Sequence, residues 1–329
     1  MKSNDYHTIK ELQDIFIEHL NRQNFLSNPK ELYEPIVYTM NIGGKRIRPV
    51  LLLMTCEIFG GDYRKALDSA VGLEVFHNFT LVHDDIMDNA SIRRGQETVF
   101  KKWNANIGIL SGDAMFAIAF DYMMRVDDKI IRKAIQLFDK TAIEVCEGQQ
   151  LDLNFETSKH VSIADYFDMI RLKTGVLIAA ALKMGAIIAE ADDRQTEIIY
   201  DFGIHIGLTF QLIDDYLDLF SHDMKFGKAR GGDILANKKT YLYIKGYELA
   251  DAKEKAQLDA LFANKEIAPR DKIEQVSAIW QSLGVPEAAC EDIKQYHAKA
   301  MQLLDKLDVP KERISELRYY ANELLERTY

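Results

Sequence analysis

The chain has 329 residues, 47% of them hydrophobic and 28% charged, which is enough apolar material for a large core and excludes a disordered chain. Its 41 Lys and Arg residues against 51 Asp and Glu residues give a net charge of −10, which argues against a nucleic-acid partner or an anionic membrane surface. No proline lies between Pro49 and Pro269, so the long middle of the chain favours helices over a turn-rich β architecture.

Apolar residues recur every three or four positions in several segments, a pattern that predicts amphipathic helices. We expect an all-α fold, with helices over residues 63–89, 111–127, 130–155, 163–190, 199–217 and 287–307. Ser162 and Asp165 predict a capped start for one of them. The segment 221–232, rich in glycine and basic residues, predicts a loop. No linker-like or repeated sequence divides the chain, so we predict a single domain over residues 1–329.

The cysteines and the apolar segments give expectations about the cellular location of the protein. Cys56, Cys146 and Cys290 are few, odd in number and far apart, which argues against a disulfide framework and favours a reducing, cytoplasmic setting. The first five residues lack the apolar core of an export signal, and the longest apolar stretch, residues 176–189, is interrupted by Lys183. We therefore expect neither export nor a membrane span.

Two acidic clusters of the form DDxxD lie within helical patterns, at residues 84–88 and 214–218. The first and last aspartates of each cluster are four residues apart, so on a helix their Cβ atoms lie about 5–6 Å from one another. This pairing costs the bare helix about 0.2–0.5 kcal/mol, a cost that a divalent cation between the carboxylates removes. Carboxylate oxygens select hard ions such as Mg²⁺, which shares its coordination with substrate phosphates. The clusters predict Mg²⁺ sites for a diphosphate, against the alternative of solvated acidic faces.

Basic residues gather in short motifs, although the chain as a whole is acidic. The planar fork of arginine and the compact charge of lysine both suit phosphate oxygens, so a second phosphorylated substrate could bind here without metal. Taken singly, Lys228 or Arg48 is better explained as a surface charge, and His77 as a structural histidine. The candidates are Lys45, Arg48, His77, Arg93, Arg94, Lys173, Lys228 and Lys238.

The motifs, taken in order, resemble those of the trans-isoprenyl diphosphate (polyprenyl) synthase family over nearly the whole chain. The matching segments are GGKRIRP, HDDIMDNASIRRG, GQQLDL, KTG, FQLIDDYLD and FGKARGGDILANKKT. A complete series in order is a far more specific signal than any one member. The resemblance implies the isoprenoid synthase type I fold, a bundle of mostly antiparallel helices around a central cavity. It also implies a homodimer, and the apolar run 115–120 could line its interface or the core.

Carried onto matching positions, the resemblance implies a role for each motif in condensing isopentenyl diphosphate with an allylic diphosphate. The leading Mg²⁺ ligands would be Asp84, Asp88 and Asp214, supported by Asp85, Asp215 and Asp218. The allylic diphosphate would bind these ions together with Arg93, Lys173, Lys228 and Lys238. Isopentenyl diphosphate would lie on Lys45, Arg48, His77 and Arg94. Dipoles facing the transient cation would come from Lys173, Thr174 and Gln211, with Gln149 and Asp152 orienting their surroundings.

Bulky residues before the first acidic cluster are expected to limit the length of the product. Phe79 precedes Asp84 by five positions, about 7.5 Å of helix, and Phe76 precedes it by eight, about 12 Å. An aromatic residue at Phe79 followed by the small Thr80 resembles short-chain synthases that make geranylgeranyl or farnesyl diphosphate, and we favour geranylgeranyl. The alternative is that Phe76 and Phe79 only pack the core.

Other protein classes share parts of this pattern. A class I terpene cyclase has the first DDxxD, but its second metal motif is typically an Asn/Ser/Glu pattern and it lacks the GGKRIRP segment. A non-catalytic subunit of a heteromeric prenyl synthase commonly loses one aspartate motif, whereas this chain keeps both. A di-iron carboxylate bundle requires Glu-x-x-His pairs, which neither cluster contains.

Overall fold

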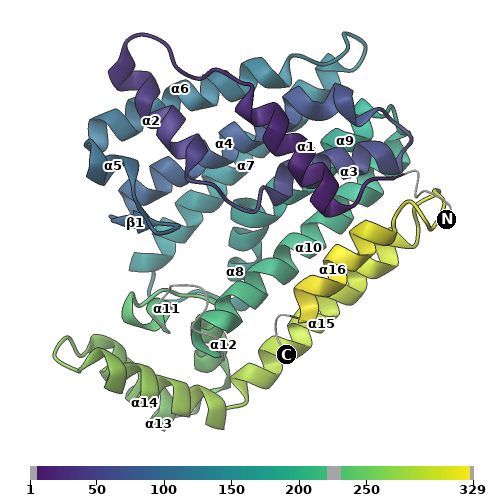
Figure 1. Ribbon diagram of the computed structural model, residues 1–329. Coiled ribbons are helices and arrows are strands. Elements are labelled where there is room, and N and C mark those ends of the chain that lie inside the picture. Colours follow the sequence, from purple (N-terminus) through teal and green to yellow (C-terminus); the bar gives the residue numbers. More distant parts are fainter. Residues whose placement is uncertain (1–5, 221–230, 327–329) are drawn as a thin grey trace. The chain divides into compact units, whose positions relative to one another are not determined.

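The computed structural model describes residues 6–220 and 231–326, and these residues are almost entirely helical or in short connections (Figure 1). The contacts between residues divide the chain into two compact units. Unit 1 contains residues 1–141, 180–200 and 307–317, and unit 2 contains residues 142–179, 201–306 and 318–329. The prediction of an all-α fold is confirmed.

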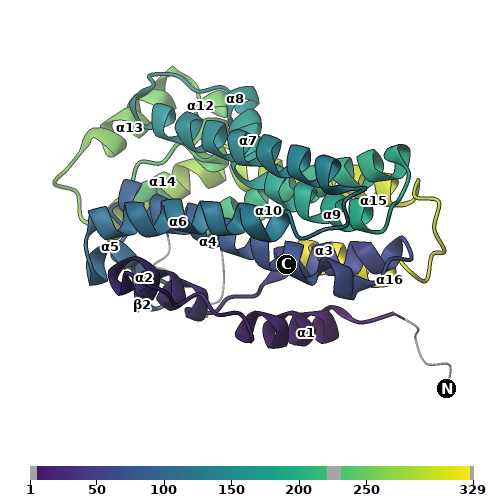
Figure 2. The same cartoon turned by 90° about the horizontal axis from the view of Figure 1, so that it is seen from above.

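Unit 1 is built around a central helix, α4. Its own elements are α1 (Ile9–Asn21), α2 (Lys30–Asn41), α3 (Ile47–Ile58), the 3₁₀ turn η1 (Tyr63–Ala66), α4 (Leu67–Met87), α5 (Val99–Lys102) and α6 (Ala105–Met123). Helices α1, α2, α3, α5 and α6 all pack on α4, and Figures 1 and 2 show α6 running beside it. Because α4 is surrounded, its residues 69–76 are all buried, and the first acidic cluster lies at its carboxyl end.

Unit 2 contains the second acidic cluster. Its own elements are α8 (Ile163–Ile170), the π-helical turn η2 (Arg171–Gly175), α11 (Gly232–Leu235), α12 (Tyr241–Leu249), α13 (Ala252–Ala263), α14 (Pro269–Ser282) and α15 (Val285–Leu304). Helix α12 packs on α8, α14 and α15. Four helices contribute residues to both units, namely α7 (Ile131–Thr157), α9 (Val176–Ile188), α10 (Asp193–Phe220) and α16 (Ser315–Glu326).

Local sequence signals explain where several helices begin. The Ser162 hydroxyl accepts from the backbone N–H of Asp165 at 3.2 Å, and the Asp165 carboxylate accepts from the backbone N–H of Ser162 at 2.9 Å, which is the predicted capping box. Asp251 with Glu254 caps α13 in the same way. Proline at the first position starts α14, where its missing N–H has no partner to lose.

The structure contains two short features that the sequence does not predict. The first is a hairpin of β1 (Ile92–Arg93) and β2 (Gln96–Glu97), in which Arg93 lies opposite Gln96. Its two turn residues, Arg94 and Gly95, have φ of 52° and 77°, as a tight two-residue hairpin requires. The second is the π-helical turn η2, which divides the expected helix 163–190 into α8 and α9. No helix within the described ranges is long and apolar enough to cross a membrane.

Candidate active site

In the first acidic cluster, the two adjacent aspartates differ in how exposed their side chains are. Asp85 is only 4% exposed, whereas Asp84 is partly exposed and Asp88 is exposed. The Asp85 carboxylate accepts from Nε of Arg93 at 2.8 Å and from its Nη2 at 2.7 Å. Burial raises the pKa of Asp85, while the Arg93 guanidinium opposes that shift. Neighbours on a helix point about 100° apart, so the Asp85 carboxylate is buried while that of Asp84 reaches the surface.

The GGKRIRP segment is anchored by Arg46, which is 7% exposed and has a left-handed backbone with φ of 50°. Its guanidinium forms an ion pair with Glu74 of α4 and donates to the carbonyl oxygen of Met40 at 2.6 Å. Asn78 also donates to Glu74 Oε1, at 2.9 Å. Since Arg46 is directed inward, its neighbour Lys45 is left exposed.

Three predicted substrate-binding residues meet around this segment in unit 1. Arg48 Nη1 lies 3.1 Å from His77 Nε2, and Arg94 donates to the carbonyl oxygen of Gly43. Burial and the charges of Arg48 and Arg94 hold the pKa of His77 well below its usual range. His77 is therefore neutral, and its Nε2 accepts from Arg48. Gly44, with φ of 135°, leaves the space that the Arg94 guanidinium fills, since a Cβ there would lie 2.6 Å from Arg94 Nη1.

The second acidic cluster, in unit 2, repeats the arrangement of the first. Asp214 is exposed and Asp218 is partly exposed, but Asp215 is only 5% exposed. Its carboxylate accepts from Tyr166 Oη at 2.6 Å, Gln211 Nε2 at 3.0 Å and the backbone N–H of Tyr241 at 3.0 Å. Burial raises the pKa of Asp215 to about 6, although all three hydrogen bonds act to lower it.

The Lys173-Thr174 pair lies in the π-helical turn. Lys173 Nζ donates to Asp152 of α7 at 2.5 Å, and Thr174 Oγ1 donates to Gln211 Oε1 at 3.1 Å. Helix α7 approaches the turn closely at Gly148, where a Cβ would lie 2.3 Å from the Lys173 backbone nitrogen. Single π-helical turns occur often at functional sites, and this one brings Lys173, Thr174 and Gln211 together in unit 2.

The last basic motif, FGKARGGDILANKKT, lies only partly within the residues that the structure describes. Lys238 is exposed, and its backbone N–H donates to the carbonyl oxygen of Asp233 at 2.9 Å. Its neighbour Lys239 donates to the carbonyl oxygen of Phe155 at 2.6 Å and to that of Ser158, so it caps the carboxyl end of α7. Lys228, which was predicted to bind the allylic diphosphate, lies outside the described residues.

The predicted limits on product length lie in an aromatic cluster of unit 1. Phe76 is fully buried, and its ring centroid lies 5.5 Å from that of Phe79 and 5.2 Å from that of Phe138. The ring of Phe116 lies 5.5 Å from that of Phe79. The small Thr80 donates to the carbonyl oxygen of His77 at 2.8 Å. This geometry suits both a barrier to a growing chain and ordinary core packing.

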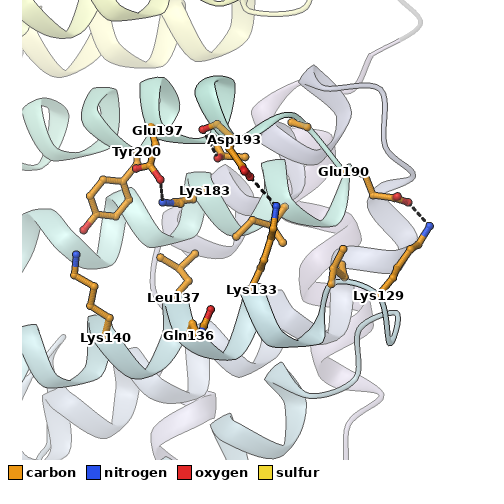
Figure 3. Close-up of a pocket in the computed structure, with 14 residues that line it drawn as sticks. Lys129, Lys133, Gln136, Leu137, Lys140, Lys183, Glu190, Asp193, Glu197 and Tyr200 are labelled. Atoms are coloured by element: carbon orange, nitrogen blue, oxygen red, sulfur yellow. Dashed lines mark hydrogen bonds and ion pairs between the residues drawn. The ribbon is translucent and has the colours of Figure 1, made fainter.

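A cavity of about 590 Å³ in unit 1 lies between α7, the end of α9 and the start of α10 (Figure 3). Ion pairs join Lys129 to Glu190 at 2.6 Å, Lys133 to Asp193 at 2.6 Å and Lys183 to Glu197 at 2.5 Å. These lysines are already matched by carboxylates, which weakens their attraction for a diphosphate. No residue of the predicted motifs lines this cavity, so we place the candidate site at the motifs.

The accessible carboxylates of the two clusters supply oxygen donors of the kind that a divalent metal ion binds. Within residues 6–220 and 231–326, no three carboxylate, histidine or cysteine side chains form a preformed metal cage. Mg²⁺ does not require one, because it usually binds through one or two carboxylates, substrate phosphates and retained waters. The oxygen donors of Asp84, Asp88 and Asp214 are therefore suitable ligands.

Several residues that organise the site were not singled out from the sequence. The Tyr166 hydroxyl and the backbone N–H of Tyr241 hold Asp215, and Glu74 holds Arg46. Glu74 carries a signal that could have been used, because it is a lone acid within the apolar stretch of α4 and so requires a buried partner. The two tyrosines carry no such signal, since a tyrosine in an apolar pattern is as readily explained by packing.

Comparisons with known proteins agree with these features. The polyprenyl synthetase family model matches residues 29–280. The geranylgeranyl diphosphate synthase of Methanosarcina mazei is 41% identical over 225 residues, which are 68% of this chain and 69% of that protein. The geranylgeranyl pyrophosphate synthase of Geoglobus acetivorans is 36% identical over 92% of both proteins. A crystal structure of a geranylgeranyl pyrophosphate synthase matches with a TM-score of 0.93 and 43% identity, covering 98% of this chain and 99% of that one. The chain belongs to the polyprenyl synthetase family and has the helical isoprenoid synthase fold.

Proposed function

We propose that the protein is a trans-prenyltransferase, which joins isopentenyl diphosphate to an allylic diphosphate and makes a short-chain all-trans prenyl diphosphate. The observation that carries this proposal is the common design of the two DDxxD clusters. In each cluster the second aspartate is buried and bonded to the protein, while the first is accessible, at Asp84 and Asp214. Two complete clusters of this design, in a member of the polyprenyl synthetase family, support catalysis rather than a non-catalytic role.

We assign Mg²⁺ as the divalent ion of the reaction. When bound, Mg²⁺ stabilises the negative charge that develops on the departing diphosphate. Asp84 and Asp88 in the first cluster, and Asp214 in the second, would be Mg²⁺ ligands, because their oxygens are hard donors that remain accessible. Asp85 and Asp215 would support the helices that carry those ligands through their bonds to Arg93 and Tyr166.

The basic residues of the chain bind the two diphosphates and lower the barrier to ionisation. The positive charges of Arg93, Lys173, Lys228 and Lys238 stabilise the allylic diphosphate as its C–O bond breaks. The double bond of isopentenyl diphosphate attacks the resulting allylic cation, and the released diphosphate removes a proton to restore a double bond. Isopentenyl diphosphate binds on Lys45, Arg48, His77 and Arg94. Since His77 is neutral, the positive charge of that site comes from its basic neighbours.

The incorporation of labelled isopentenyl diphosphate tests this function directly. The protein is incubated with Mg²⁺ and dimethylallyl, geranyl or farnesyl diphosphate, and product lengths are measured by chromatography. We expect chain extension that ceases when the metal is chelated, with geranylgeranyl diphosphate as the longest main product. No incorporation with any of the three primers would exclude the proposed activity.

Geranylgeranyl diphosphate is the proposed product because Phe79 and Phe76 occupy the turns of α4 that precede Asp84. Their rings form a continuous aromatic cluster with Phe116 and Phe138, which would stop a growing chain. We expect Phe79→Ala, and more strongly Phe76→Ala/Phe79→Ala, to shift the product distribution to longer chains, as read by chromatography. Phe16→Ala is the control, because Phe16 is as fully buried as Phe76 but lies in α1 outside the cluster. If the double variant folds and its product distribution is unchanged, Phe76 and Phe79 only pack the core.

We also propose a homodimer that uses α6. The apolar run 115–120 divides between core and surface, since Met115 and Ala119 are buried while Phe116 is 37% exposed. Ile109, Leu110 and Met124 are exposed on the same helix or directly after it. Several large apolar side chains exposed on one helix favour burial against a second subunit.

Two further expectations stay predictions. The single domain over residues 1–329 is supported by the family model, whose match runs through segments of both units. A cytoplasmic location is supported by the low number and wide spacing of the cysteines.

A further inference from the structure

A chain of hydrogen bonds in unit 2 joins the π-helical turn to the second acidic cluster. Thr174 Oγ1 donates to Gln211 Oε1 at 3.1 Å, and Gln211 Nε2 donates to Asp215 Oδ1 at 3.0 Å. The other carboxylate oxygen of Asp215 accepts from Tyr166 Oη at 2.6 Å. One buried aspartate therefore connects a tyrosine of α8 with Thr174 and Gln211, the two side chains for which the family resemblance implies cation stabilisation.

The Asp215 carboxylate determines the orientation of the Gln211 side-chain amide. An amide group has a donor end and an acceptor end of almost the same shape, so its partners set its direction. A carboxylate oxygen only accepts, which directs the amide nitrogen of Gln211 toward Asp215. The carbonyl oxygen then faces Thr174 and takes the hydroxyl hydrogen. The Thr174 oxygen and the Gln211 carbonyl oxygen keep lone pairs, while the Gln211 amide nitrogen, which retains a second N–H, lies on the side of Asp215.

This direction matters for the proposed reaction, because an allylic cation is stabilised by oxygen lone pairs and destabilised by the positive end of an N–H dipole. If the amide were reversed, it would present its NH₂ group where the oxygen now lies. The benefit depends on a dipole fixed before the reaction begins, since a freely rotating amide would have to be ordered at each turnover.

Asp215 is itself held by the protein rather than left for a ligand. It is 5% exposed, and its two oxygens accept three hydrogen bonds, from Tyr166, Gln211 and the backbone of Tyr241. The Tyr241 N–H and the Tyr166 hydroxyl both bond to Oδ2, so Oδ1 is directed to Gln211. Without the Tyr166 hydroxyl, the carboxylate loses one of the three hydrogen bonds that hold its orientation.

We propose that Tyr166 is a positioning residue, which acts through Asp215 to fix the polarity of the Gln211 amide and the Thr174 hydroxyl. The inference rests on the proposed prenyl transfer. It gives Asp215 a structural task distinct from that of the accessible aspartates, and it gives α8 a part in the chemistry although Tyr166 touches no substrate.

The chain offers a closely matched control for this test. Tyr166 and Tyr241 are both 1% exposed, and their rings lie 6.0 Å apart at 67°. Each hydroxyl donates to a carboxylate at 2.6 Å, Tyr166 to Asp215 and Tyr241 to Asp292. Tyr241→Phe therefore removes an equivalent buried hydroxyl but keeps the backbone bond to Asp215.

The test compares Tyr166→Phe with Tyr241→Phe in the full-length protein, with wild type assayed alongside. We expect Tyr166→Phe to lower kcat by about 10- to 100-fold, as loss of a supporting hydrogen bond behind reacting groups does, with the KM for both diphosphates within about 2-fold. The ratio of water-captured prenyl alcohol to extended product should rise. Tyr241→Phe should leave kcat and this ratio near wild type, and both variants should have similar unfolding midpoints.

A double-mutant cycle then tests whether Tyr166 acts through Gln211. Gln211→Met removes the amide at nearly constant volume, so adding Tyr166→Phe should lower kcat little further. Additive losses of kcat, or equal effects of the two tyrosine variants, would overturn the positioning role. Inactive wild-type protein would instead refute the proposed function, so the two failures are distinguishable.

Discussion

Asp84→Ala and Asp214→Ala should each lower kcat/KM for metal-dependent condensation by about 100- to 1000-fold or more, because each removes a ligand for the ion that stabilises the leaving diphosphate. The protein should stay folded. Asp214 is exposed, and its removal relieves a like-charge pair with Asp218 that costs the bare helix about 0.2–0.5 kcal/mol. We therefore expect the unfolding midpoint of Asp214→Ala to equal or slightly exceed that of wild type.

Asp201→Ala is the matched control, since Asp201 is another exposed aspartate on α10 but lies outside the cluster. It should leave kcat/KM unchanged. A second measurement separates binding from turnover: Mg²⁺ with inorganic diphosphate should raise the unfolding temperature of wild type and Asp201→Ala, but much less that of Asp214→Ala. Normal turnover by either Asp84→Ala or Asp214→Ala would contradict the assignment of both clusters to the metal.

The helices and the motif positions could be predicted because their signals are local. Periodic apolar residues set the extent of α10, found at Asp193–Phe220 where the sequence indicates 199–217. The capping box at Ser162 depends on residues three positions apart and is present as predicted. Helix geometry also implies that adjacent aspartates such as Asp84 and Asp85 face different surroundings, but it does not say which one is buried.

The remaining features depend on contacts between residues far apart in the chain. Tyr166 and Asp215 are 49 positions apart, and Arg46 and Glu74 are 28 apart, so neither pair has a pattern that a sequence window detects. The hairpin at Arg93 is too short to show alternation, and the π-helical turn differs from an α-helix by one inserted residue. Organising interactions of this kind, rather than the accessible motif residues, are what the structure adds.

Glu74→Ala should lower the free energy of unfolding by about 3–5 kcal/mol, because it leaves the buried guanidinium of Arg46 without its counter-charge. Glu74 is 2% exposed and Arg46 is 7% exposed, so water cannot readily replace the lost partner. Such a loss is a large share of the roughly 5–15 kcal/mol that stabilises a typical domain. Urea unfolding should show it as a lower midpoint.

The double variant Arg46→Met/Glu74→Leu separates the cost of an unpaired charge from the value of the ion pair. Two apolar side chains of similar volume leave no buried charge, so the double variant should regain most of the stability that Glu74→Ala loses. Asp14→Ala, which breaks the exposed pair with Lys10, should leave the midpoint almost unchanged.

If Glu74→Ala unfolds at the same urea concentration as Asp14→Ala, the buried pair does not anchor the GGKRIRP segment, and the exposure of Lys45 needs a different cause. If instead the double variant folds but its KM for isopentenyl diphosphate rises, the ion pair also orients that segment, because stability and substrate affinity then separate in one protein.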